Sequence, residues 1–115
     1  EVPVTLNEVL TINFILDSGA SDVSISPDVA LTLIKTKTIR SQDWLPGAYY
    51  RFADGSTAKS ARFKLSSLKL GNRILHDVAC TISNSIEAPM LLGQSALEKL
   101  GKYSIDYRNM VIEVY

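Results

Sequence analysis

The residue best placed to do chemistry in this sequence is Asp17, which directly follows the apolar residues 14–16 and precedes Ser-Gly-Ala. Apolar neighbours remove solvation from a carboxylate. Gly19 allows the backbone to turn sharply, and the Ser18 hydroxyl can lock that turn by hydrogen bonding. An aspartate that only closes a strand and caps a turn has the same local sequence. The segment alone therefore fits either a reactive acid or a turn cap.

Other types of catalytic site find little support in the sequence. His76 is the only histidine and Cys80 the only cysteine, and no Gly-x-Ser-x-Gly motif or glycine-rich phosphate loop is present. One cysteine excludes an internal disulfide framework, and a single Cys and His serve metal binding poorly. We interpret these two residues as a core thiol and a surface imidazole. We expect no metal and no cofactor.

The length and charge of the chain restrict its class. A chain of 115 residues predicts a single domain over residues 1–115. Twelve basic and twelve acidic residues cancel, so no net charge attracts nucleic acid or an anionic membrane. No apolar run approaches the ~18 to 20 residues of a membrane span, so we expect no direct membrane insertion by this segment. The cellular location stays unassigned. An alternative is a soluble domain of a larger bacterial protein, tethered to a membrane or periplasmic through a segment outside this chain.

The pattern of the sequence is mostly that of short strands separated by turns. Apolar and β-branched runs at close spacing favour an all-β sandwich or barrel. Ser26-Pro27-Asp28 predicts a short helix over residues 27–34, and Gly101 ends one or two helical turns that begin near Gln94. Residues 35–47 are predicted to be a polar connection. Hairpin turns are predicted at Asn7-Glu8, Asp54-Gly55, Gly71-Asn72 and Arg108-Asn109.

Three segments together resemble a retropepsin-type aspartic protease: ILDSGAS, the hairpin around ADGS, and MLLGQSALEKLG followed by a closing hairpin. They occur in the order expected for a single-lobe protease, and the resemblance covers nearly the whole chain. It is closer to the retropepsin-like domains encoded in bacterial genomes than to the viral enzymes. The resemblance implies an all-β fold, a closed β-barrel-like retropepsin (acid protease) fold with one or two short helices.

The resemblance also implies an aspartic endopeptidase that hydrolyses peptide bonds. Two carboxylates that share one proton are needed, because two like charges ~3 Å apart cannot both ionise. The chain holds a single motif in which an aspartate follows apolar residues and precedes Ser/Thr-Gly. Asp22, Asp54 and Asp106 do not stand in such a motif. A homodimer with paired Asp17 residues would supply the second, and the partners expected are a second copy and a polypeptide substrate. One alternative is a catalytically silent retropepsin-fold module for dimerisation or peptide binding; another is a monomeric structural domain in which Asp17 is a turn cap.

The family pattern assigns roles to the residues of two segments. Asp17 matches the catalytic aspartate, Ser18 the hydroxyl residue that bonds across the dimer axis, and Gly19 the glycine whose N–H helps to hold the carboxylates. Ala20 stands where many relatives have a hydroxyl, so one stabiliser of the anion is missing and we expect a mildly acidic to near-neutral optimum. An activity maximum below about pH 3 would count against that argument.

The family pattern continues after the Asp17 loop. Leu91, Leu92 and Gly93 match the apolar pair and glycine that pack beneath the active loop. Gln94 and Ser95 replace the Arg-Asn of the viral enzymes, which puts the polar brace of those residues in question.

The hairpin around Asp54-Gly55 matches the flap that closes over a bound peptide in this family. We expect substrate contacts from the flap residues Tyr50, Phe52, Ala53, Asp54 and Gly55. Cross-strand aromatic packing is an equally open interpretation for Tyr50 and Phe52. We also expect Asp22 to bind the peptide backbone of the substrate, with a solvated turn residue as the alternative.

Overall fold

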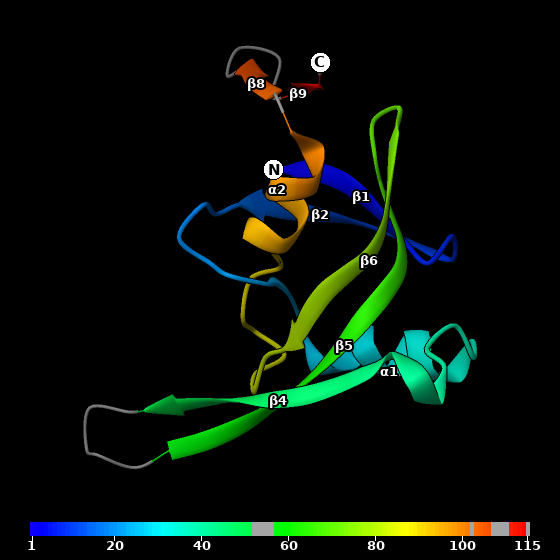
Figure 1. Cartoon of the computed structure of the whole chain (residues 1–115), viewed down its shortest axis with the longest axis vertical. Coiled ribbons are helices and arrows are strands. Elements are labelled where there is room, and N and C mark those ends of the chain that lie inside the picture. Colours follow the sequence, from blue (N-terminus) through cyan, green and yellow to red (C-terminus); the bar gives the residue numbers. More distant parts are fainter. Residues whose placement is uncertain (52–56, 102, 107–110, 115) are drawn as a thin grey trace.

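The described residues form a closed β-barrel with one strand added at its edge, two short helices and a separate two-stranded sheet (Figure 1). The structure, a computed structural model, describes residues 1–51, 57–101, 103–106 and 111–114, with side chains over 1–46 and 61–101. The strand order β1-β2-β7-β3-β6-β5 closes because β1 also pairs with β5, and β4 continues the sheet beyond β5. The strands are β1 (Val2–Leu6), β2 (Leu10–Leu16), β3 (Val23–Ile25), β4 (Trp44–Arg51), β5 (Thr57–Leu70), β6 (Arg73–Ile82) and β7 (Leu91–Leu92). The predicted fold class is confirmed.

The first hairpin follows directly from the sequence. Strands β1 and β2 pair in antiparallel register from Val2 opposite Phe14 to Leu6 opposite Leu10. Alternate residues of β1 are buried, as expected for a strand with one face on the core. Asn7 and Glu8 form the turn with φ angles of 48° and 64°. The predicted turn is therefore confirmed.

Strands β5 and β6 form a long antiparallel hairpin that runs diagonally up the molecule in Figure 1. Their register runs from Arg62 opposite Thr81 to Leu70 opposite Arg73, with Gly71 in the turn at a φ of 59°. The long length of β5 allows it to pair with β4 at one end and with β1 at the other. One strand thus belongs to both the barrel wall and the β4–β5 hairpin.

The prediction of a polar connection over residues 35–47 is wrong in its second half. Residues Ser41–Asp43 form a 3₁₀ turn, η1, and β4 already begins at Trp44. Asp43 is buried and its carboxylate accepts hydrogen bonds from the backbone and side chain of Arg40, which fixes this turn. The Trp44 ring packs against Phe63 of β5, with 5.6 Å between the ring centroids. This aromatic contact across the two strands stabilises the start of β4 directly after η1.

Both predicted helices are present. Helix α1 (Pro27–Lys35) has its proline in the first turn and buries Val29, Ala30 and Leu33. Helix α2 (Gln94–Leu100) ends at Gly101, which has a φ of 71°. Strands β8 (Tyr103–Asp106) and β9 (Val111–Val114) form a separate antiparallel pair, and the turn predicted at Arg108-Asn109 lies outside the described residues.

The barrel interior is filled with apolar side chains. The largest that are completely enclosed include Phe14, Phe63, Leu65 and Leu92. Cys80 is buried among them and His76 is exposed, as the sequence predicted. Burial raises the pKa of the Cys80 thiol well above its ordinary value. No helix among the described residues is both long enough and apolar enough to span a membrane.

Candidate active site

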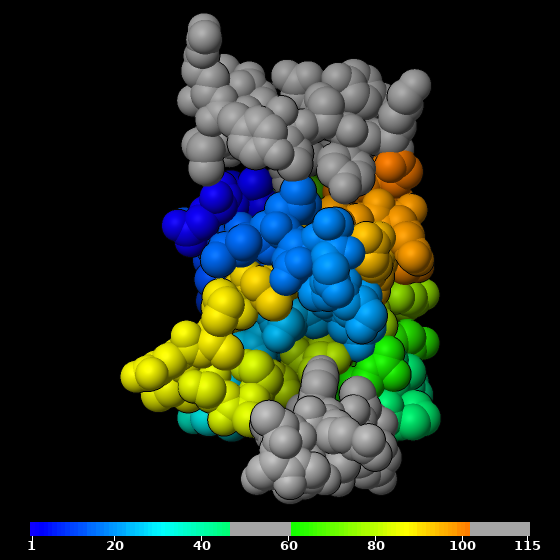
Figure 2. All heavy atoms as spheres, turned by 90° about the vertical axis from the view of Figure 1, so that its left-hand side faces the viewer, coloured from blue at the N-terminus to red at the C-terminus, as the bar shows by residue number. Residues whose placement is uncertain are grey.

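Asp17 sits in a tight turn directly after β2, and backbone hydrogen bonds fix its position. Its N–H donates to the carbonyl oxygen of Leu92 at 3.1 Å, and its own carbonyl oxygen accepts from Ala20 N–H at 3.2 Å. The N–H of Gly19 donates to Asp17 Oδ1 at 2.9 Å. The side chain is half-buried, while Ser18 and Gly19 are exposed. Figure 2 shows this part of the chain (blue) in the middle of one face of the molecule, beside the yellow residues that precede β7.

Strand β7 lies beneath the Asp17 turn and joins the two strands on either side of it. Leu91 and Leu92 pair in parallel with Ile15 and Leu16, and Leu91 also pairs with Ser24 of β3. The family resemblance implied that this apolar pair packs beneath the loop, and Leu92 is fully buried. The turn that holds Asp17 therefore stands on a strand from a distant part of the chain.

Gly93 is required by the close approach of the loop after Asp17. A Cβ atom at this position would lie 2.2 Å from the carbonyl oxygen of Asp22 and 2.8 Å from that of Ala20. Both are backbone atoms that cannot move away without shifting the loop. Because no real Cβ contact is that short, every other residue type would displace the segment that carries Asp17.

The start of α2 braces the same loop with polar contacts. The N–H groups of Gln94 and Ser95 donate to the carbonyl oxygens of Ala20 and Ser21, each at 2.8 Å. The first N–H groups of a helix have no hydrogen-bond acceptor within the helix, and these two find their acceptors in the loop. The Gln94 side-chain Nε2 donates to the Ser18 carbonyl oxygen, also at 2.8 Å. The brace that the replacement of Arg-Asn put in question is present with other chemistry.

The Ser95 side chain makes further contacts that no sequence pattern predicted. Its hydroxyl donates to the Ala79 carbonyl oxygen at 2.7 Å and accepts from the Val23 N–H at 3.0 Å. The hydroxyl thereby bridges β6 and β3 behind the active loop. In the sequence, only the position of Ser95 two residues after Gly93 linked this residue to the site.

Asp22 is held by two partners from neighbouring strands. Its Oδ2 accepts from Arg62 Nε at 2.7 Å and from the Thr81 hydroxyl at 2.7 Å, and its Oδ1 accepts from Arg62 Nη2 at 3.3 Å. Its side chain is 13% exposed. Burial alone would raise the pKa of Asp22, but the hydrogen bonds from Arg62 and Thr81 and the guanidinium charge outweigh it and leave the pKa lowered. Asp22 is thus an ionised residue in an internal ion pair, and its contact with substrate stays a prediction.

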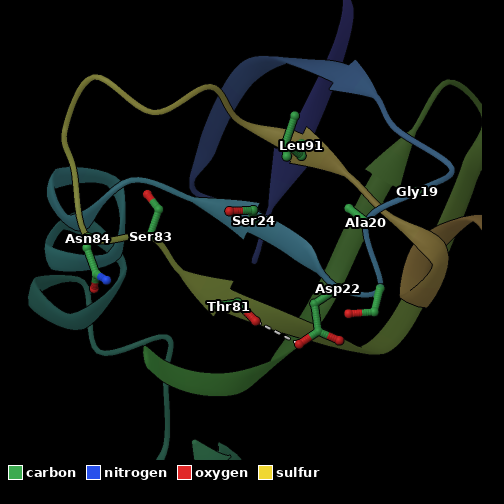
Figure 3. Close-up of a pocket in the computed structure, with 9 residues that line it drawn as sticks. Gly19, Ala20, Asp22, Ser24, Thr81, Ser83, Asn84 and Leu91 are labelled. Carbon is green, nitrogen blue, oxygen red and sulfur yellow. Dashed lines mark hydrogen bonds between the residues drawn. The ribbon is translucent and has the colours of Figure 1, made fainter. Parts of the chain in front are cut away.

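A cavity of about 470 Å³ opens beside the Asp17 turn. Figure 3 shows Ala20, Ser24 and Leu91 reaching it from three segments, with the Thr81 hydroxyl directed at the Asp22 carboxylate. Among the described residues, the lining carries hydroxyl and amide groups together with small apolar surfaces. The lining residues are Gly19, Ala20, Ser21, Asp22, Ser24, Thr81, Ser83, Asn84 and Leu91.

The structure brings most of the predicted site residues together. Asp17, Ser18, Gly19 and Ala20 form the turn, and residues 91–93 lie beneath it. The backbone of Tyr50 pairs with Ala58 in the β4–β5 hairpin, while its side chain lies outside the described part. The predictions for Phe52, Ala53, Asp54 and Gly55 lie outside the described residues altogether.

The electrostatic surroundings of Asp17 differ from those of the other buried or half-buried aspartates. Within the described side chains, the ion pairs are Arg40–Asp43 and Arg62–Asp22, and neither includes Asp17. Of its two carboxylate oxygens, Oδ1 accepts the Gly19 N–H, and no bond to Oδ2 is formed by the described residues. Among the described side chains, the half-buried Asp17 carboxylate therefore has no basic partner.

Comparison with known proteins agrees with this geometry. Residues 2–99 match the model of the family described as "gag-polyprotein putative aspartyl protease". The chain belongs to this family. Its Asp-Ser-Gly turn and its Leu-Leu-Gly strand both lie within the matched region.

A solved structure shows the same fold. The crystal structure of a retropepsin-like aspartic protease from Rickettsia conorii is 24% identical, covers 96% of this chain and 86% of that one, and superposes with a TM-score of 0.69. A search of curated proteins gives no match. The family and the fold together make the chain a retropepsin-like member of an aspartyl protease family.

Proposed function

We propose that the chain is an aspartic endopeptidase whose active form is a homodimer, with a water activated between the two Asp17 carboxylates. The observation that carries this proposal is the Asp17 turn: a carboxylate held by a backbone amide, without a basic partner among the described residues, in a member of an aspartyl protease family. In such a pair one carboxylate is the general base that takes a proton from water. The other, protonated, donates to the carbonyl oxygen of the scissile bond.

The need for a second copy follows from the count of available acids. Only one Asp-Ser-Gly motif occurs in the sequence. Asp22 is engaged by Arg62 and Thr81, so it is a poor candidate for a second catalytic acid within the same chain. A two-fold axis beside the turn would place Asp17 opposite its own copy. Ile15, which is 45% exposed two residues before Asp17, offers apolar surface for such a contact.

The residues around Asp17 take supporting roles in this proposal. The Ser18 hydroxyl, exposed at the tip of the turn, would hydrogen-bond across the axis, and the Gly19 N–H orients the carboxylate. Leu91, Leu92 and Gly93 support the turn from below, and the absence of a hydroxyl at Ala20 leaves the anion with one stabiliser fewer. The β4–β5 hairpin would cover a polypeptide substrate, with contacts from Tyr50, residues 52–55 and Asp22.

The proposal is tested by measuring cleavage of a peptide library against pH for the wild-type chain and for Asp17→Asn, with oligomeric state followed by sedimentation. The expected result is cleavage by the wild type, which rises in specific activity with protein concentration, and none by the variant. Equal cleavage by the variant would exclude the aspartic mechanism. A wild-type dimer that binds statine-type inhibitors but never cleaves would instead support a peptide-binding module.

A further inference from the structure

Arg62 joins three parts of the molecule that surround the candidate active site. It lies in β5, where its backbone neighbours are Leu45 of β4 on one side and Thr81 of β6 on the other. From there its guanidinium reaches Asp22, in the segment that follows Asp17. The side chain is 28% exposed, so much of it lies within the protein. A single residue therefore contacts the active loop and the base of the hairpin.

The contact with the hairpin occurs where the ladder between β4 and β5 is interrupted. Register shifts between Leu45 and Ala48, so the residues between them have no regular partner on β5. Arg62 Nη1 donates to the carbonyl oxygen of Pro46 at 3.4 Å, within this irregular stretch. Bulges bend a strand and change its direction. The guanidinium thus contacts the backbone of β4 at the point where the β4–β5 hairpin departs from the barrel.

The contact with the active loop has the geometry of a strong pair. Two guanidinium nitrogens face the two oxygens of one carboxylate, an arrangement that fixes orientation as well as distance. Thr81, the cross-strand neighbour of Arg62, donates to the same carboxylate. The carbonyl oxygen of Asp22 in turn lies close to Gly93, which directly follows β7.

We propose that Arg62 is a positioning residue that couples the β4–β5 hairpin to the Asp17 loop, so that the two keep a fixed relation when a peptide lies between them. The proposal rests on the proposed function for its effect on catalysis. Loss of the link would loosen the hairpin and weaken peptide binding throughout the reaction. Such a loss raises KM and leaves kcat nearly unchanged.

The chain contains a matched control for this pair. Arg40 also binds both oxygens of one carboxylate, that of Asp43, through Nε and Nη2 at 3.2 and 3.0 Å. Both partners of this second pair lie within residues 40–43, in the short segment before β4. Arg40→Gln therefore removes the same kind of interaction without touching the link.

The test compares Arg62→Gln, Arg62→Lys and Arg40→Gln by amide hydrogen exchange of residues 17–24 and 44–51, and by KM and kcat on a peptide long enough to reach the hairpin. Arg62→Gln should speed exchange in both segments about tenfold and raise KM about three- to tenfold with kcat within about twofold. Arg62→Lys should recover part of each effect, because it keeps the charge and loses the fork. Arg40→Gln should leave residues 17–24 and KM unchanged, because the Arg40–Asp43 pair braces only the turn directly before β4.

The possible failures can be told apart. If Arg62→Gln speeds exchange in only one segment, or speeds exchange of residues 17–24 no more than Arg40→Gln does, the link is wrong. If exchange changes as expected while the wild type cleaves no peptide, the link stands and the proposed function fails. If Arg62→Gln does not fold, the same comparison is made with Asp22→Asn, which keeps the shape of the side chain; unchanged exchange in both segments would then overturn the link.

Discussion

The amide nitrogen of Asp17 lies 3.1 Å from the carbonyl oxygen of Leu92, which hydrogen-bonds the candidate catalytic residue to a strand 75 positions later in the chain. The same strand leads into Gly93 and the first turn of α2, whose amides hold the carbonyl oxygens of Ala20 and Ser21. The position of the carboxylate is therefore set by the residues 91–95 beneath it as much as by its own turn.

Replacement of Asp17 by asparagine should abolish cleavage without unfolding the protein. The amide has nearly the same shape but can neither accept nor release the catalytic proton, so we expect kcat to fall by about 10²–10⁴-fold. The measurement is peptide cleavage, with the fold followed by circular dichroism. Asp77→Asn is the control, because Asp77 is exposed and has a φ of 55°, which asparagine tolerates. Retained activity in Asp17→Asn would contradict the assignment.

Replacement of Gly93 by alanine should destabilise the protein and disturb the active loop. Its new methyl group would meet the backbone at Asp22 and Ala20, and overpacking of this kind typically lowers the free energy of unfolding by ~1–3 kcal/mol or more. Denaturant unfolding measures the loss. Gly71→Ala is the comparison, because a Cβ there has no atom within 4 Å and only the φ of 59° opposes it, at about 1–2 kcal/mol. Only Gly93→Ala should also reduce cleavage; equal losses of activity would argue against the steric account.

Replacement of Ser95 by alanine should lower the free energy of unfolding by about 1–3 kcal/mol, because the Val23 N–H and the Ala79 carbonyl oxygen both lose their partner. Urea unfolding at neutral pH measures the change. Ser85→Ala, which removes an exposed contact to the Glu87 N–H, should change stability by less than about 1 kcal/mol. A Ser95→Ala protein as stable as the wild type would mean that the hydroxyl does not bridge β3 and β6 in solution.

The Asp22 ion pair should make part of the stability dependent on pH. Although burial opposes ionisation, the bonds from Arg62 and Thr81 lower the pKa of Asp22 in the folded protein below its unfolded value of about 3.9. Its contribution is then complete above that unfolded value and is lost as the pH falls through the folded pKa. The difference in unfolding free energy between wild type and Asp22→Asn should be constant from neutral pH to about pH 5 and shrink below about pH 4. A difference that grows on acidification would contradict this.

Local signals in the sequence predicted much of the fold. The turns at Asn7 and Gly71, the proline at the start of α1 and the glycine at the end of α2 each restrict a few neighbouring residues, and each lies where it was expected. The family resemblance, and not a local signal, predicted that the Asp-Ser-Gly turn lies next to the Leu-Leu-Gly strand, and the two segments are hydrogen-bonded. The start of β4 was missed, because the contact between Trp44 and Phe63 that extends it joins positions far apart in the chain.

The support of the site could not be predicted from the sequence. Arg62 and Asp22 are 40 residues apart, and no periodicity links a basic residue in a long strand to a carboxylate in a turn. The same holds for Ser95 with Ala79 and for the pairing of Thr5 with Lys69 that closes the barrel. Such contacts depend on how the strands are arranged in space, which short-range patterns do not contain.

The most direct test of the central claim, two Asp17 residues per active site, is a subunit-mixing experiment. Wild-type chain at a fixed concentration, well above that needed for dimer formation, is mixed with increasing amounts of Asp17→Asn and allowed to exchange before cleavage is measured. If the site is shared between two copies, random pairing reduces the activity per wild-type chain to about one half at equal amounts and about one quarter at a threefold excess. Activity that stays constant as the variant is added would show that each chain acts alone, and would contradict the proposed mechanism.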